Sequence, residues 1–144
     1  SPEPSGACLR RTIQLALDQA QLSPTHVDYI NAHGSATQMN DVNEARCVAE
    51  VFGHNGSAPP PISGTKAYTG HALGAAGAIE AVATILAMRA SHLIPTLHLE
   101  EFDSGFPKLD YVPNNGRGGV AIRHALSLSL GFGGINSGLI FGQV

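Results

Sequence analysis

The stretch from Ala75 to Ala90 constrains the fold more than any other part of the chain. It is rich in Ala, Ile, Leu and Met, a composition that predicts one long helix. A helix with so little polar face is typical of a protein interior and not of a surface. We therefore expect other layers of structure to cover this helix.

Strand-like and helix-like segments alternate along the rest of the chain. Apolar residues recur at helical spacing from Leu9 to Ala20, and again from Val42 to Phe52 after the N-cap candidates Asn40 and Asp41. Strand-like runs occupy residues 27–31, 62–65, 93–97, 120–130 and 137–141. This alternation predicts an α/β fold in which helices cover a sheet.

The length and charge of the chain suggest one domain that meets another. We expect residues 1–5 to be a linker and residues 6–144 to form one domain. Charged residues make up 13% of the chain, against about 25% in an ordinary soluble domain. Part of the surface is therefore expected to be buried against a domain or subunit. The absence of a basic cluster argues against nucleic-acid binding.

Neither a membrane segment nor a metal site is predicted. No apolar run reaches the roughly 20 residues that span a bilayer, which favours a soluble, cytoplasmic protein. Cys8 and Cys47 have neither CxxC nor zinc-site spacing. We expect both to be free thiols in a reducing compartment, packed as small hydrophobic residues. No cofactor is indicated.

Three polar segments flanked by glycine follow or join the strand-like runs. They are Asn31–Thr37, Gly64–His71 and Gly131–Asn136. Loops at strand ends are where α/β proteins build sites, and small residues beside a histidine let a substrate approach closely. Taken singly, each segment also has an ordinary structural explanation. The remaining histidines are expected to be structural or surface residues: His26, His54, His92, His98 and His124.

Together and in this order, the segments resemble the β-ketoacyl synthases of the thiolase superfamily. The first is similar to N-A-H-G-T-x-T, which is followed by an acidic pair, here Asp41 and Glu44. The second is similar to K-x-x-x-G-H-x-x-G-A-A-G, and the third to G-F-G-G-x-N. Two positions depart from the pattern: Ser35 stands where Thr is usual, and Leu130 where Phe is common.

The resemblance implies the C-terminal half of the α-β-α-β-α thiolase architecture, with helix 75–90 as the central layer. It implies an acyltransferase that condenses acyl thioesters with malonyl-acyl carrier protein, with loss of CO2, in fatty-acid or polyketide synthesis. The implied partners are acyl carrier protein bearing acyl or malonyl phosphopantetheine thioesters, and the N-terminal half; the complete enzyme is expected to be dimeric. The nucleophilic cysteine belongs to that other half. Neither Cys8 nor Cys47 stands at the strand-to-helix turn it requires, so this chain lacks the nucleophile.

The resemblance also assigns roles to the histidines and the lysine. His33 and His71 would each donate a ring N–H to the malonyl carbonyl oxygen and so stabilise the enolate. Lys66 would support the histidines, paired with Glu80, because an unpaired buried charge is costly. Which ring nitrogen donates cannot be read from sequence.

The third segment is expected to form a gate. Phe132 would be the gating residue and its backbone N–H half of an oxyanion hole, while Gly131 and Gly133 let the loop swing. Asn136 would brace this turn. The hydroxyl residues Ser35 and Thr37 complete the supporting set.

Two other functions fit the same resemblance less well. A non-catalytic partner subunit of the chain-length-factor type would typically have degraded motifs, whereas His33, Lys66 and His71 are all present. Thiolysis requires a C-terminal cysteine motif that this sequence does not contain.

Overall fold

The computed structural model describes residues 5–53 and 56–144 of the chain. Most of the expected linker 1–5, and His54, therefore lie outside the described residues. Short 3-10 turns are found at Pro24–His26, Leu73–Ala75 and Phe132–Gly134. The helices and strands, in chain order, are α1 (Ala7–Ala20), β1 (Tyr29–Asn31), α2 (Gln38–Phe52), β2 (Ile62–Ser63), α3 (Lys66–Thr69), α4 (Ala76–Ala90), β3 (His92–Leu93), β4 (Arg117–Gly118), β5 (His124–Leu130) and β6 (Asn136–Gly142).

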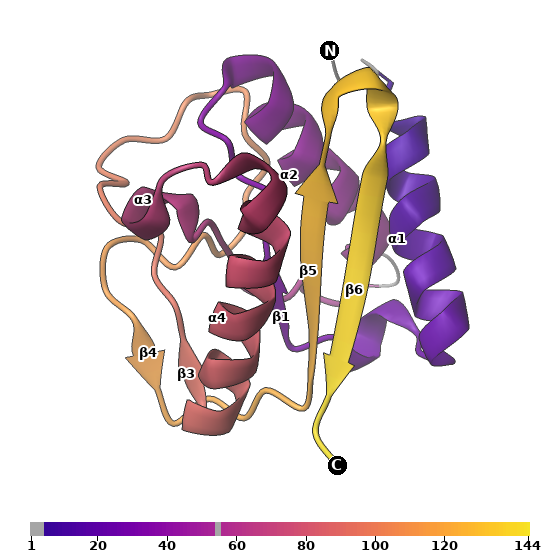
Figure 1. Cartoon of the computed structure of the whole chain (residues 1–144), viewed down its shortest axis with the longest axis vertical. Helices are drawn as coiled ribbons and strands as arrows, with labels where there is room; N and C mark the ends of the chain where they lie inside the picture. Colours follow the sequence, from indigo (N-terminus) through magenta and orange to yellow (C-terminus); the bar gives the residue numbers. More distant parts are fainter. Residues whose placement is uncertain (1–4, 54–55) are drawn as a thin grey trace.

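The strands form a mixed sheet in the order β2-β1-β5-β6, and β3 pairs with β4 in a separate antiparallel ribbon. β1 runs parallel to both β2 and β5, whereas β6 returns antiparallel to β5. Helices make the crossovers between the parallel strands, as parallel pairing requires. The predicted α/β fold is confirmed (Figure 1).

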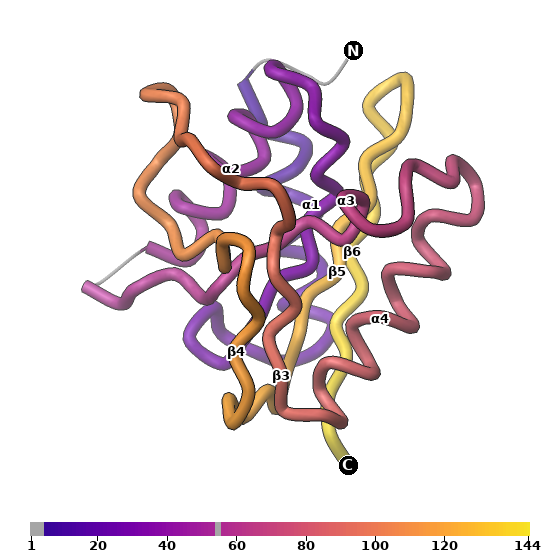
Figure 2. The backbone as a smooth tube through the Cα atoms, turned by 90° about the vertical axis from the view of Figure 1, so that its left-hand side faces the viewer, coloured from indigo at the N-terminus to yellow at the C-terminus, as the bar shows by residue number. Residues whose placement is uncertain are grey.

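Helices cover both faces of the sheet. Figures 1 and 2 show α4 on one face, with α1 and α2 on the opposite face. Neighbouring residues of a strand point to opposite faces. Accordingly, Ile30 packs into the core under α1 and α2, whereas Tyr29 packs into the core under α4. Both faces of β1 are therefore buried.

Several predicted boundaries were wrong: the strands expected at 27–31, 62–65 and 120–130 are shorter, at Tyr29–Asn31, Ile62–Ser63 and His124–Leu130, and two further differences have a local cause. α2 begins at Gln38, before the expected cap at Asn40 and Asp41, and Thr37 is its N-cap. Asp41 instead stands in the first turn, where its carboxylate accepts a hydrogen bond from the Ala36 N–H at 3.1 Å. The strand expected at 93–97 ends at Leu93. Pro95, which has no N–H to donate to a ladder, explains that early end.

α4 is buried on one side only, and its two faces are the reverse of an ordinary surface helix. Apart from Met88, the buried residues of the helix are small or polar: Ala76, Glu80, Thr84 and Ala87. The larger aliphatic residues on the other side are exposed: Ile79, Val82, Ile85 and Leu86. Within the described chain, the apolar face of α4 therefore has no cover.

The apolar stretch is longer than the sequence suggested. Together with the 3-10 turn before it, α4 forms an 18-residue helical stretch, Leu73–Ala90. By length and composition alone, this stretch could cross a membrane. The core helix of a soluble protein passes the same test. Here the inner face of the helix packs on β5, and its Glu80 takes part in a buried ion pair.

Candidate active site

The candidate site lies at the carboxyl ends of β1 and β2. Asn31 and Ser63, the last residues of these strands, are partners in the parallel register. The first two polar segments follow these strands directly and so meet at one edge of the sheet. A cavity of about 370 Å³ opens between them.

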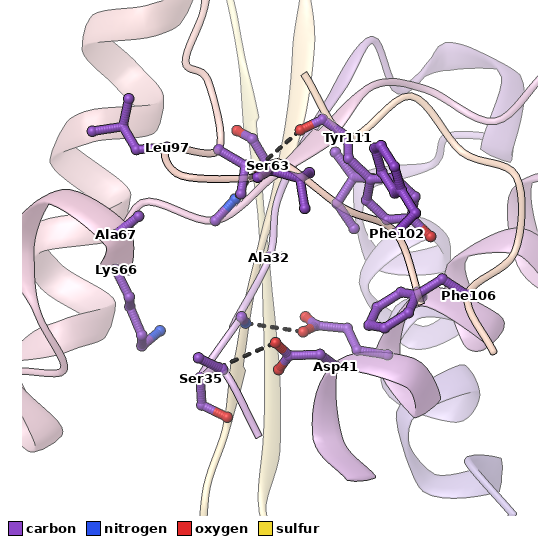
Figure 3. A pocket seen from close by; sticks show the side chains of 18 of the residues that line it. Ala32, Ser35, Asp41, Ser63, Lys66, Ala67, Leu97, Phe102, Phe106 and Tyr111 are labelled. Carbon is purple, nitrogen blue, oxygen red and sulfur yellow. Dashed lines mark hydrogen bonds between the residues drawn. The ribbon is translucent and has the colours of Figure 1, made fainter. Parts of the chain in front are cut away.

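The cavity has a polar end and an aromatic side. Lys66 points into it from the start of α3, while Phe102, Phe106 and Tyr111 stand opposite (Figure 3). His71 also contributes to the wall. Ser35 lies at the polar rim, with its hydroxyl 3.3 Å from that of Thr37. The cavity thus combines cationic and hydrogen-bonding groups with an apolar surface.

The two predicted histidines are neighbours. The ring centroids of His33 and His71 lie 5.4 Å apart, and the rings cross at 81°. His33 is buried, whereas His71 is exposed. The two loops therefore bring the imidazoles side by side; His71 lines the cavity, whereas His33 is not among the lining residues.

Hydrogen bonds identify the proton-bearing nitrogen of each neutral ring. The Lys66 ammonium, which can only donate, lies 3.4 Å from His33 Nδ1. The Leu73 N–H donates to His71 Nδ1 at 3.2 Å. Both Nδ1 atoms are therefore acceptors, with ring orientations assigned from these partners. Each neutral histidine then carries its proton on Nε2.

His33 stays neutral under ordinary conditions. Burial lowers its pKa to about 4, and the positive charge of Lys66 and the nearby His71 act in the same direction. At neutral pH His33 therefore has one N–H donor and one acceptor nitrogen, and does not carry a positive charge of its own.

Lys66 and Glu80 form the expected ion pair, and both side chains are buried. The Lys66 ammonium also donates to the His33 carbonyl oxygen, so its three protons have three partners. Burial raises the pKa of Glu80, and the hydrogen bond and charge of Lys66 oppose that rise. Among the described residues, Glu80 Oε2 is the one buried side-chain polar atom without a hydrogen-bond partner.

A polar network ties β1 to α4 behind this pair. The Asn31 amide donates to the Glu80 carbonyl oxygen at 3.2 Å and to the Thr84 hydroxyl at 3.0 Å. Thr65 donates to Asn31 Oδ1 at 3.4 Å. Sequence reasoning did not assign a role to Thr84 or Thr65. Thr84 could have been found from the sequence, because it is a polar residue one turn after Glu80 in a mostly apolar helix.

Glu44 is a second buried carboxyl group at the site. Its two oxygens accept hydrogen bonds from the backbone N–H groups of His33, at 2.7 Å, and Gly34, at 3.0 Å. The sequence marked Glu44 only as one of an acidic pair, because a contact across the fold is not visible in a sequence.

The glycine-rich turn is not part of this cavity. It forms the tip of the β5–β6 hairpin, closed by the Gly131 N–H donating to the Ile135 carbonyl at 2.7 Å. Phe132 is 91% exposed. The residues that line the cavity include no member of the segment from Gly131 to Asn136. The gating, oxyanion and bracing roles of this segment therefore stay predictions.

The cysteines lie away from the cavity. Cys8 is exposed on α1 and Cys47 is buried on α2, and neither forms a disulfide. Burial raises the pKa of the Cys47 thiol, which disfavours its reactive thiolate form. In the part of the chain that the structure describes, no group of three or more His, Cys, Asp or Glu residues is placed to hold a metal ion.

Comparison with known sequences gives a consistent match. Residues 1–100 match the family described as the beta-ketoacyl synthase C-terminal domain. The 3-oxoacyl-[acyl-carrier-protein] synthase 2 of Staphylococcus aureus is 40% identical over 98% of this chain and 34% of its own length. The enzyme of the same name from Synechocystis is 44% identical over 98% of this chain and 33% of its own. The chain thus spans about a third of the curated relatives it matches.

Solved structures agree. A type II polyketide ketosynthase in complex with its acyl carrier protein superposes with a TM-score of 0.92 at 40% identity, over 100% of this chain and 35% of its own. A beta-ketoacyl synthase from Burkholderia phymatum gives 0.90 at 40% identity, over 98% and 33%. A ketosynthase in complex with its chain length factor from Xenorhabdus doucetiae gives 0.87 at 34%, over 100% and 35%.

Proposed function

The chain belongs to the β-ketoacyl synthase family, as its C-terminal domain with a thiolase-like fold, and on that premise we propose that it supplies the decarboxylation machinery of a condensing enzyme. The observation that carries the proposal is the pair His33 and His71. Their Nδ1 atoms are both occupied as acceptors, so both Nε2–H groups are left to donate.

The chemistry requires such donors. When a malonyl thioester loses CO2, the electron pair of the breaking C–C bond moves toward the thioester carbonyl, whose oxygen becomes an enolate. Two fixed N–H donors at that oxygen stabilise the developing charge, and preorganised donors of this kind lower a barrier most when they need not reorient. The carbanion then attacks the carbonyl carbon of an acyl thioester; the new C–C bond forms, the C–S bond breaks, and the thiolate leaves.

Lys66 acts through His33. Its contact with Nδ1 keeps the His33 proton on Nε2, and its positive charge helps keep that ring neutral. Glu80 compensates the buried ammonium. In this proposal Lys66 and Glu80 are positioning residues, and the two histidines contact the substrate.

The acyl group must be accepted elsewhere, because neither Cys8 nor Cys47 lines the cavity. We assign that step to a cysteine in the part of a synthase that precedes this domain in its longer relatives. The partners proposed with it are that N-terminal half, acyl carrier protein carrying acyl or malonyl thioesters, and a second copy of the complete, cytoplasmic enzyme.

A partner subunit of the chain-length-factor type is the second candidate, since ketosynthases similar to this chain are found in complex with such factors. The intact Lys66–Glu80 ion pair and the histidine pair support the catalytic role instead. A subunit with no reaction to catalyse gains nothing from a buried charge, which is costly to maintain.

Native and denatured mass spectrometry of the purified material, followed by an acyl-transfer assay, tests the proposal. We expect an N-terminal half that bears a cysteine on a strand-to-helix turn, either as a second polypeptide or fused to this chain. An acyl group should be transferred to that cysteine. A complex that decarboxylates no malonyl thioester and forms no acyl-enzyme would contradict the catalytic role and favour the partner subunit.

A further inference from the structure

Glu44 holds the backbone from which the His33 side chain extends, and we propose that it is a positioning residue that fixes how the His33 ring enters the site. Its carboxylate spans two consecutive N–H groups, those of His33 and Gly34, at 2.7 and 3.0 Å. Glu44 is itself buried, with 2% of its surface exposed. The catalytic consequence of this role rests on the proposed function, whereas the contacts do not.

The need for Glu44 follows from where the sheet ends. The Ala32 N–H still donates to the Ser63 carbonyl, but the next two N–H groups have no strand to pair with. At Gly34 the backbone turns into the left-handed region, with φ of 47°. Buried N–H groups are rarely left without an acceptor, and a carboxylate with two oxygens satisfies both at once.

His33 is thereby held at three separate atoms. Glu44 fixes its N–H, while Lys66 contacts both its carbonyl oxygen and its ring Nδ1. Anchoring at N–H, carbonyl and ring fixes the backbone and the side chain together. The Nε2–H group is then aimed by the protein before any ligand arrives, which is the condition for electrostatic preorganisation.

The hold that Glu44 exerts depends on its ionisation. Burial raises the pKa of Glu44 to about 7, although its hydrogen bonds to Gly34 and His33 act to lower it. Asp41 on the same helix raises it further, and Lys66 from α3 lowers it. Protonation turns one carboxylate oxygen into a donor, so one of the two N–H groups loses its acceptor. The other titratable groups that line the same cavity are His71, Glu101, Asp103 and Tyr111, and His33 stands beside His71.

Hydrogen–deuterium exchange of the 144-residue chain, read by mass spectrometry so that association is tolerated, tests this role. In Glu44→Gln we expect the protection of the His33 and Gly34 amides to fall by about ten- to a hundredfold. The matched control is Glu50→Gln, which alters an exposed carboxylate on the same helix that pairs with Arg10. Protection unchanged at the two amides, or lost evenly throughout a folded chain, would overturn the proposal.

A measurement on the unmodified chain covers the case in which Glu44→Gln does not fold. Between about pH 8 and about pH 6, the protection of the same two amides, corrected for intrinsic exchange, should fall while that of Ile30 in β1 holds. A flat profile at His33 and Gly34 would overturn the proposal.

Turnover separates this inference from the proposed function. In an assembled synthase, Glu44→Gln should lower kcat for malonyl decarboxylation about tenfold with KM unchanged, because a misaimed donor loses transition-state stabilisation. A raised KM with unchanged kcat would overturn the positioning role. If the proposed function itself fails, His71→Ala will not alter decarboxylation, and the exchange result will be unaffected.

Discussion

His33 and His71 stand with their rings 5.4 Å apart and crossed at 81°, although they follow different strands of the sheet. Each ring is oriented through Nδ1 by a different donor, Lys66 for one and the Leu73 N–H for the other. The site therefore has two independently supported N–H donors, and damage to one support should not disorder the other ring.

Removing the ammonium from the buried ion pair should destabilise the fold. Lys66→Met leaves the Glu80 carboxylate without its partner, which costs about 3–5 kcal/mol in the free energy of unfolding. Urea denaturation at neutral pH measures this cost. Lys108→Met, at an exposed lysine, is the control and should change stability little. If Lys66→Met/Glu80→Gln is no more stable than Lys66→Met alone, the pair does not act as described.

His33 should make stability depend on pH between about 4 and 6.5. Its pKa is lowered from 6.5 to about 4 in the folded chain, so within that window the unfolded chain binds a proton that the folded chain refuses. The free energy of unfolding therefore falls as the pH drops through this window. Glu44, whose pKa is raised from 4.5 to about 7, has the opposite effect: between those pH values its contribution to the free energy of unfolding rises as the pH drops.

The comparison that isolates His33 is wild type against His33→Gln, because the contribution of Glu44 is present in both. Denaturation across the window should show a smaller decline toward acid in the variant. Identical pH dependence in the two proteins would contradict a lowered pKa at His33.

The uncovered face of α4 should make the isolated chain associate. Val82 is 58% exposed and Leu86 57%, and an apolar surface of this kind favours contact over hydration. Sedimentation velocity should show oligomers, and the chain should bind a hydrophobic dye. The double variant Val82→Lys/Leu86→Lys should shift the oligomers toward monomer. Leu15→Lys on α1, where Leu15 is 43% exposed, is the control. A compact monomer that binds no dye would argue against an interface on this face.

The turn at the tip of the β5–β6 hairpin should not accept a side chain at Gly133. Its φ of 78° lies in the left-handed region, where a Cβ costs about 1–2 kcal/mol. Gly133→Ala should lower the free energy of unfolding by about that amount. Gly74→Ala is the control, because a Cβ there meets no atom within 4 Å and the backbone is not left-handed. If the two substitutions changed the free energy of unfolding equally, the turn would accept a side chain at Gly133, against this prediction.

The sequence predicted the elements better than their contacts. Helix α1 and the strand–helix alternation follow from apolar spacing, and the Lys66–Glu80 pair follows from placing Glu80 one turn into α4. The start of α2 was missed because Thr37 caps it without a side-chain hydrogen bond, which leaves no strong signal.

Other features depend on distances that only the fold sets. α4 is apolar on nearly every side, so periodicity could not show that Glu80 and Thr84 mark its inner face. The role of Glu44 depends on the positions of the His33 and Gly34 N–H groups. The exposure of Phe132 depends on the geometry of a hairpin tip. The turn from Gly131 to Gly134 was predicted correctly as a turn, but its position outside the cavity could not be predicted from the sequence.

Malonyl-thioester decarboxylation by the synthase assembled with its N-terminal part, wild type against His71→Ala, tests the central claim most directly. Loss of one of two enolate donors should lower the rate by about a hundredfold or more, while His92→Ala, an exposed histidine outside the cavity lining, should leave it unchanged. An undiminished rate in His71→Ala would contradict the assignment of the histidine pair.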